Sequence, residues 1–290
     1  MENTNLPIGL SLTPDAPPTH TFGEIHDMFS ATLFGASLFR NIRYARYKPE
    51  AVSNEEWCRL LGADVNNLQH IFLTYGIARQ FILHSQENGE CLAQEEQRQL
   101  LLAAIVHDWG EAIVGDETYD KKNDSFEERE IEAGKFIIQA VFGNNNLPTN
   151  LMEDTFVNIA FDCTTKLGRM FNAIEMIGYL RTALRAVDES KKLTNEQIQQ
   201  YPDLRQRLYW LVNNVLIQQI DQLVSYADQY SAVKLYLEEG SDRISEAFEI
   251  ITDETFDFYP AEEREKKKQI FVQTQSSWQT FMKTQTPVVA

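Results

Sequence analysis

Apolar residues recur at helical spacing along most of the chain, and this periodicity constrains the fold more than any other feature. It is clear near the start, at Ile25, Met28 and Phe29, and again near the end, in LRQRLYWLVNNVLIQQIDQLVSYADQY. A spacing of three or four residues places apolar side chains on one face of an α-helix. No stretch alternates as a half-buried strand does, and glycine and proline are sparse, at 13 and 9 of 290 residues. The sequence therefore predicts an all-α helical bundle.

Breaks in the apolar pattern divide the chain into helices and larger segments. Asn66 or Asn67 is suited to cap a long helix, and Ser125 with Glu128 resembles a capping box. The predicted helices cover residues 24–47, 54–62, 68–85, 93–106, 125–142, 150–161 and 168–187, with more beyond Pro202. We expect three segments: an irregular arm (1–22), a main helical domain (23–190) and a C-terminal helical extension packed on the core (191–290).

The charge balance excludes some classes of partner. The formal net charge is −17 and the isoelectric point is near 4.7, whereas a general nucleic-acid or anionic-membrane surface needs a basic face. A small phosphorylated substrate is compatible, because it needs only a few local donors and a cation. The N-terminus lacks the pattern of a signal peptide and no 18-residue apolar run occurs, so a cytoplasmic protein is expected.

The stretch AAIVHDWGEAIVGDE, residues 103–117, interrupts an apolar helix with polar side chains. It is either an ordinary helix end with solvated acids or a metal site with a catalytic carboxylate. His107 and Asp108 are residue types that ligate divalent cations. If the helix continues for one turn, Glu111 lies on the neighbouring surface, where it can activate water or protonate a leaving oxygen. Gly115 permits a tight turn, and Asp116 follows it.

Other segments offer further ligands for such a site. His70 lies inside a separate predicted helix, and Asn172 and Glu175 lie on a third. Lys121 and Lys122 follow the histidine-aspartate pair closely, where they either hold a phosphate or are solvated charges. Helices hold such side chains rigidly, which a metal-assisted hydrolytic site requires.

These segments resemble the HD-domain phosphohydrolases, over roughly residues 30–188. HDWGEAIVGD is similar to the family pattern H-D-x-x-E-x-x-x-G-D, NNLQHIFLTYGIARQF to its first-histidine helix, and RMFNAIEMIGYL to its last metal-bearing helix. The branch that contains bacterial 5′-deoxynucleotidases is the most similar. The resemblance implies metal ligation by His70, His107 and Asp108, and proton handling or water orientation by Glu111 and Asp116.

The nucleotidase relatives also place a phosphate-binding arginine beside an aromatic residue ahead of the first-histidine helix. Arg43, followed by Tyr44, stands in such a position and could bind a phosphate through a bidentate contact. A basic surface patch is the alternative.

The chain departs from the family at its last ligand, an aspartate on the final helix. The best register puts Asn172 there, and Asn is a neutral, weaker oxygen ligand. Glu175, one turn later, could take over with a longer reach, and Asp162 is a less favoured substitute. No histidine follows His107, which argues against the diiron members of the family. We expect one divalent ion of unspecified identity (Mn, Co, Ni, Zn, Fe or Mg).

The expected function is metal-dependent hydrolysis of a small phosphomonoester, with a nucleoside 5′-monophosphate favoured. Two alternatives stay open: hydrolysis of nucleoside triphosphates or alarmones, and a non-enzymatic binding or regulatory role on a degenerate HD scaffold. Relatives often dimerise, which makes a homodimer one expected arrangement.

Overall fold

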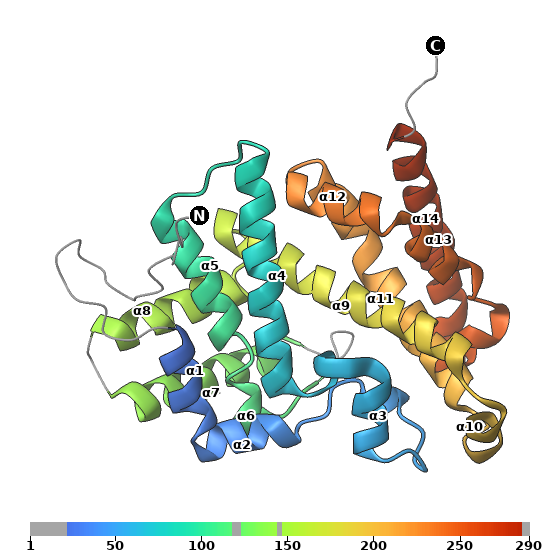
Figure 1. Cartoon of the computed structure of the whole chain (residues 1–290), viewed down its shortest axis with the longest axis horizontal. Helices are drawn as coiled ribbons and strands as arrows, with labels where there is room; N and C mark the ends of the chain where they lie inside the picture. The colour runs from blue at the N-terminus through green and yellow to red at the C-terminus, as the bar shows by residue number, and fades with distance from the viewer. Residues whose placement is uncertain (1–21, 118–122, 144–146, 286–290) are drawn as a thin grey trace, which may run out of the picture. The chain divides into compact units, whose positions relative to one another are not determined.

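The computed structural model describes residues 22–117, 123–143 and 147–285. Over these residues the protein is built from helices (Figure 1), and no strand occurs apart from an isolated antiparallel bridge between Ile42 and Asn66. The all-α prediction is confirmed. No helix within the described ranges combines the length and apolar character that crossing a bilayer demands.

The chain divides into two compact units whose segments alternate along the sequence. Of the described residues, the first unit contains those within 22–43, 66–79 and 92–172, and the second contains the others. Helices α4 and α9 each begin in the first unit and continue into the second. The expected boundaries near residues 22 and 190 stay a prediction.

The first unit carries the sequence motifs. Its core clusters apolar side chains from α1, α4, α5, α7 and α8, with α6 in contact with α2 and α7. Its helices are α1 (Phe22–Ser30), α2 (Leu33–Arg40), the start of α4 (Asn67–Glu87), α5 (Gln94–Val106), α6 (Glu111–Val114), α7 (Asp124–Phe142), α8 (Leu147–Thr155), the π-helical η3 (Phe156–Phe161) and the start of α9 (Lys166–Lys192).

The second unit is organised around the long helix α11, which contacts α12 and α14. Beside α11, Phe256 and Tyr259 pack with Ile217, and the Tyr259 hydroxyl donates a 3.0 Å hydrogen bond to Asn214 Oδ1. Its elements are η1 (Ala45–Tyr47), α3 (Asn54–Leu61), η2 (Gly62–Val65), the ends of α4 and α9, α10 (Asn195–Gln200), α11 (Leu204–Ala227), α12 (Ser231–Glu239), α13 (Ser241–Glu249), η4 (Asp253–Phe258) and α14 (Ala261–Gln285).

The cap of α4 agrees with the sequence, whereas the cap of α7 does not. Asn66 Oδ1 accepts hydrogen bonds from the backbone N–H groups of Leu68 and Gln69, as an N-cap does. The predicted capping box at Ser125 is wrong. Asn123 caps α7 instead, accepting from the Phe126 N–H, so the helix begins earlier and Ser125 lies inside its first turn.

The single helix predicted over 24–47 is wrong, because the chain breaks between α1 and α2. Thr32 ends one helix and starts the next: its hydroxyl donates to the Phe29 carbonyl and accepts from the Gly35 N–H. A Cβ at Gly35 would lie 2.5 Å from Ser30 Cα. The two helices therefore meet too closely for any side chain at that position.

Candidate metal centre

His107 and Asp108 follow directly on the buried end of α5. Residues 102–106 are all buried, and Trp109, just after the pair, is fully buried as well. Its ring stacks on Phe29, with centroids 4.2 Å apart and planes 7° from parallel. Because the residues on both sides of the turn are packed in the core, the side chains of His107 and Asp108 are fixed in position and shielded from solvent. The interpretation as a helix end with solvated acids is wrong for this pair.

The hydrogen bond of His107 indicates which ring nitrogen is available to a metal. Nδ1 lies 3.1 Å from the Ala104 carbonyl oxygen, which can only accept a hydrogen bond. In the neutral ring the proton is therefore on Nδ1, and Nε2 keeps its lone pair, as in most metal-ligating histidines. Nε2 lies 3.3 Å from Asp108 Oδ1. A nitrogen lone pair and a carboxylate oxygen at this separation favour a cation between them.

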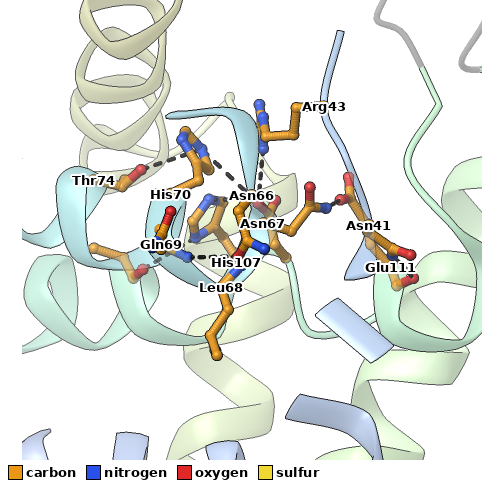
Figure 2. Close-up of polar contacts among 12 residues, drawn as sticks. Asn41, Arg43, Asn66, Asn67, Leu68, Gln69, His70, Thr74, His107 and Glu111 are labelled. Carbon is orange, nitrogen blue, oxygen red and sulfur yellow. Dashed lines mark hydrogen bonds and ion pairs between the residues drawn. The ribbon is translucent and has the colours of Figure 1, made fainter. Parts of the chain in front are cut away.

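His70 on α4 joins this pair, so three predicted ligands meet from two segments of the chain. Its Nε2 lies 3.8 Å from Asp108 Oδ2, and its ring centroid is 5.3 Å from that of His107. The Thr74 hydroxyl, one turn later on α4, lies 3.2 Å from the same nitrogen (Figure 2). His70 is 2% exposed.

Arg43 brings a positive charge to this cluster. Its guanidinium donates a 2.9 Å hydrogen bond to Asp108 Oδ2, and both side chains are buried. Burial, and then the charge of Arg43, hold the pKa of His70 well below its usual value of 6.5. The His70 imidazole is therefore neutral at neutral pH, which is the form that binds a metal. The structure places Arg43 on a candidate ligand, and phosphate binding by it stays a prediction.

Glu111 is a buried carboxylate that two asparagines hold. It is the first residue of α6 and is 2% exposed, so it is no solvated acid. The Asn67 side-chain amide donates to its carboxylate, and the Asn41 amide donates to its backbone carbonyl at 3.0 Å (Figure 2). Both its main chain and its side chain are thus restrained.

Three further predicted residues follow the turn. Asp116 follows Gly115, which has a φ of 85°, a left-handed conformation that favours glycine, and Asp116 is exposed. Its catalytic role stays a prediction. Lys121 and Lys122, predicted to hold phosphate, lie outside the described residues.

Helix α9 carries the candidates for the last ligand. Asn172 and Glu175 are both half-buried and lie one turn apart on this continuous helix. Asn172 is the last residue of the first unit, whereas Glu175 belongs to the second. Asp162, the less favoured substitute, is bonded within its own turn, where its Oδ1 accepts from the Thr164 N–H and hydroxyl. Whether Asn172 or Glu175 completes the metal site stays a prediction.

The donor set fits a divalent ion. It consists of two imidazole nitrogens with the Asp108 carboxylate beside them, a mixture that Zn, Fe, Co, Ni and Mn accept. The carboxylate of Asp108 is shared between Arg43 and the two histidines, so its charge is the negative centre of the cluster.

Gly110 is needed because the turn presses against α7. A Cβ there would lie 2.3 Å from the Glu130 carbonyl oxygen and 2.9 Å from Glu130 Cγ. Any side chain would push α6, and with it Glu111, away from the position just described.

The sequence interpretation missed the two asparagines that hold Glu111. A signal for Asn67 existed, because it stands three residues before His70 and so shares its helical face. Asn41 is 70 residues from Glu111, and nothing local in the sequence indicates that contact.

Comparison with known proteins agrees with this geometry. A model of the HD-domain family matches residues 67–232, which is more than half of the chain. No curated protein and no solved structure matches it. The matched region contains His70, the histidine-aspartate pair and α9. The chain belongs to the HD-domain family, whose members are generally metal-dependent hydrolases.

Proposed function

We propose that the protein is a cytoplasmic metal-dependent phosphohydrolase that cleaves a small phosphomonoester, with nucleoside 5′-monophosphates as its substrate class. The observation that carries the proposal is the buried meeting of His70, His107 and Asp108 within an HD domain, with the buried Glu111 three residues after Asp108. The class of monoester rests on the resemblance of HDWGEAIVGD and its neighbouring helices to the nucleotidase branch.

Four side chains would hold the ion: His70, His107, Asp108 and Glu175, with Asn172 as the neutral alternative on α9. A divalent ion bound there lowers the pKa of a coordinated water and neutralises charge on the phosphoryl oxygens. The two histidines serve as neutral nitrogen donors, in keeping with the lowered pKa of His70.

Arg43 would orient the phosphate. A guanidinium has five N–H donors in a planar fork, so one can bond Asp108 while another bonds a phosphoryl oxygen. Its place on Asp108 keeps the fork next to the reacting centre.

Glu111 would manage the proton of the reaction. A water oxygen forms a bond to phosphorus and the ester P–O bond breaks, without a covalent intermediate. The proton that the water loses passes to the Glu111 carboxylate, and from there to the alkoxide oxygen of the leaving group. Asp116 would support the orientation of the water.

Phosphate release from a panel of nucleotides and sugar phosphates tests the proposal. The protein is stripped of metal and assayed with manganese, cobalt, magnesium, zinc or nickel restored singly. Release that requires a metal and is confined to monophosphates is the expected result. Release from triphosphates or alarmones would instead establish that alternative substrate class.

A matched pair of variants tests the role of Glu111. Glu111→Gln removes the proton acceptor with little change in shape, and turnover should fall while metal binding is retained. Glu128→Gln makes the same chemical change at an exposed position of α7, and its turnover should equal that of the wild type. Equal turnover for both variants would overturn the assignment of Glu111.

One observation favours a second candidate, a non-enzymatic binding protein. In the best register of the resemblance, Asn172 stands where the family has an aspartate, and a neutral amide binds a cation more weakly than a carboxylate does. On this alternative the stripped protein regains no metal, and every substrate of the panel gives no phosphate. Metal uptake together with turnover would exclude it.

A further inference from the structure

We propose that Asn67 is a positioning residue that aims the Glu111 carboxylate at the metal centre. This inference rests on the proposed function, in which Glu111 carries the proton. Asn67 lies outside the HDWGEAIVGD stretch: it precedes His70 by one turn on α4, whereas Glu111 lies on α6.

The contact is direct and fully buried. Asn67 Nδ2 donates to Glu111 Oε2, with Asn67 0% and Glu111 2% exposed (Figure 2). A carboxylate with no solvent around it takes its direction from the donors that contact it, and hydrogen bonds to a charged group are about twice as strong as neutral ones. Asn67 and His70 lie on the same face of α4. The helix that carries the proposed ligand His70 therefore also orients the Glu111 carboxylate.

A second observation argues against a role in packing alone. Asn67 Oδ1 is buried and has no hydrogen-bond partner within the described ranges. Burying an acceptor without a donor is unfavourable, and an apolar residue would fill this space without that loss. The hydrogen bond that the Asn67 amide donates to the Glu111 carboxylate therefore offsets the cost of burying the amide oxygen without a donor.

The main chain of Glu111 is held separately, since Asn41 donates to its carbonyl at 3.0 Å and the Ser37 hydroxyl donates to the next carbonyl, of Ala112, at 2.8 Å. These bonds place the main chain of Glu111. The bond from Asn67 acts on its carboxylate instead. Its loss should therefore change the direction of the carboxylate and leave the turn intact.

Asn67→Asp is the sharp test. Aspartate has nearly the same shape, and it is favourable in the first turn of a helix, where α4 has Asn67. It replaces the donor to Glu111 by a second carboxylate. We expect kcat to fall about 10–100-fold, as for other residues that orient a functional group, with KM and manganese affinity close to those of the wild type. Gln69→Glu, the same amide-to-acid change at an exposed position of the same turn, should leave kcat unchanged.

A reversed pair gives a readout that does not depend on turnover. In the double variant Asn67→Asp, Glu111→Gln, the new glutamine amide can donate to the new carboxylate. The metal-free double variant should unfold at a higher temperature than Asn67→Asp alone, while turnover stays lost.

Three outcomes would overturn the inference. If Asn67→Asp has the kcat of an active wild type, Asn67 does not position Glu111, and the proposed function still stands. If the double variant unfolds no later than Asn67→Asp, the two side chains are not coupled. If the wild type itself releases no phosphate from any substrate, the proposed function fails, and the role of Asn67 falls with it.

Discussion

Replacing Arg43 with methionine removes a cation that is paired with Asp108. The two side chains are 6% and 8% exposed and lie 2.9 Å apart. Removing one partner of a buried ion pair costs roughly 3–5 kcal/mol, because the other charge is left uncompensated. Methionine keeps most of the volume of the apolar stem of the arginine, so the loss in the free energy of unfolding is mainly electrostatic. With an unfolding entropy of roughly 2.1 cal/mol/K per residue over the chain, Tm should fall by about 5–8 °C.

A bound divalent ion should reverse part of this loss. The ion compensates Asp108 in place of the guanidinium, and in the variant the charge of Arg43 no longer repels it. A ligand at about 100 times its Kd stabilises a protein by roughly 2.7 kcal/mol. The gain in Tm on adding manganese should therefore be larger for the variant than for the wild type at the same concentration.

Urea and thermal unfolding of metal-stripped protein, with and without manganese, measure both effects. Arg40→Met is the control, because Arg40 is exposed at the end of α2, and its effect should stay within about 0.5 kcal/mol. If Arg43→Met unfolds within about 1 kcal/mol of the wild type, or gains no more from manganese, the electrostatic account of the cluster is wrong.

Three further predictions concern pH, metal affinity and packing. Burial lowers the pKa of His26 below 6.5, so below about pH 6.5 the unfolded chain binds more protons than the folded one. The free energy of unfolding should therefore fall as the pH drops through that range. In thermal unfolding between pH 5 and 7.5, the Tm of His26→Gln should fall less steeply with acid than that of the wild type. Glu175→Gln should weaken manganese binding in a calorimetric titration and Asn172→Asp should strengthen it, because ligand charge governs affinity. Tighter binding by Glu175→Gln than by Asn172→Asp would refute the assignment of metal ligands to α9. Trp109→Ala should lower the free energy of unfolding by about 3–5 kcal/mol in urea, since the ring is fully buried on Phe29, and a loss below about 1 kcal/mol would contradict its role as an anchor.

The parts of the structure that could be predicted are those with a local signal. Helical spacing predicts the bundle, because burial of one apolar face determines each helix. His70, His107 and Asp108 were identified by their pattern, and the structure brings them together. The same pattern indicates a role for Glu111, but it does not indicate that the side chain is buried. That burial depends on the packing of α6 against α7 and α2.

The parts that could not be predicted depend on contacts between distant residues. The break before α2 arises from the close approach at Gly35 and the two hydrogen bonds of Thr32, none of which changes the helical spacing of its neighbours. The salt bridge from Arg43 to Asp108 spans 65 positions. An arginine near an aromatic residue indicates phosphate binding and a surface patch about equally, and only the fold reveals its partner.

Metal content and phosphate release, measured on one preparation before and after stripping, test the central claim most directly. The account predicts about one divalent ion per chain, release that is lost with the ion and regained when it is restored, and the loss of both in His107→Gln. Release that survives stripping, or that His107→Gln leaves unchanged, would contradict a metal centre at the end of α5.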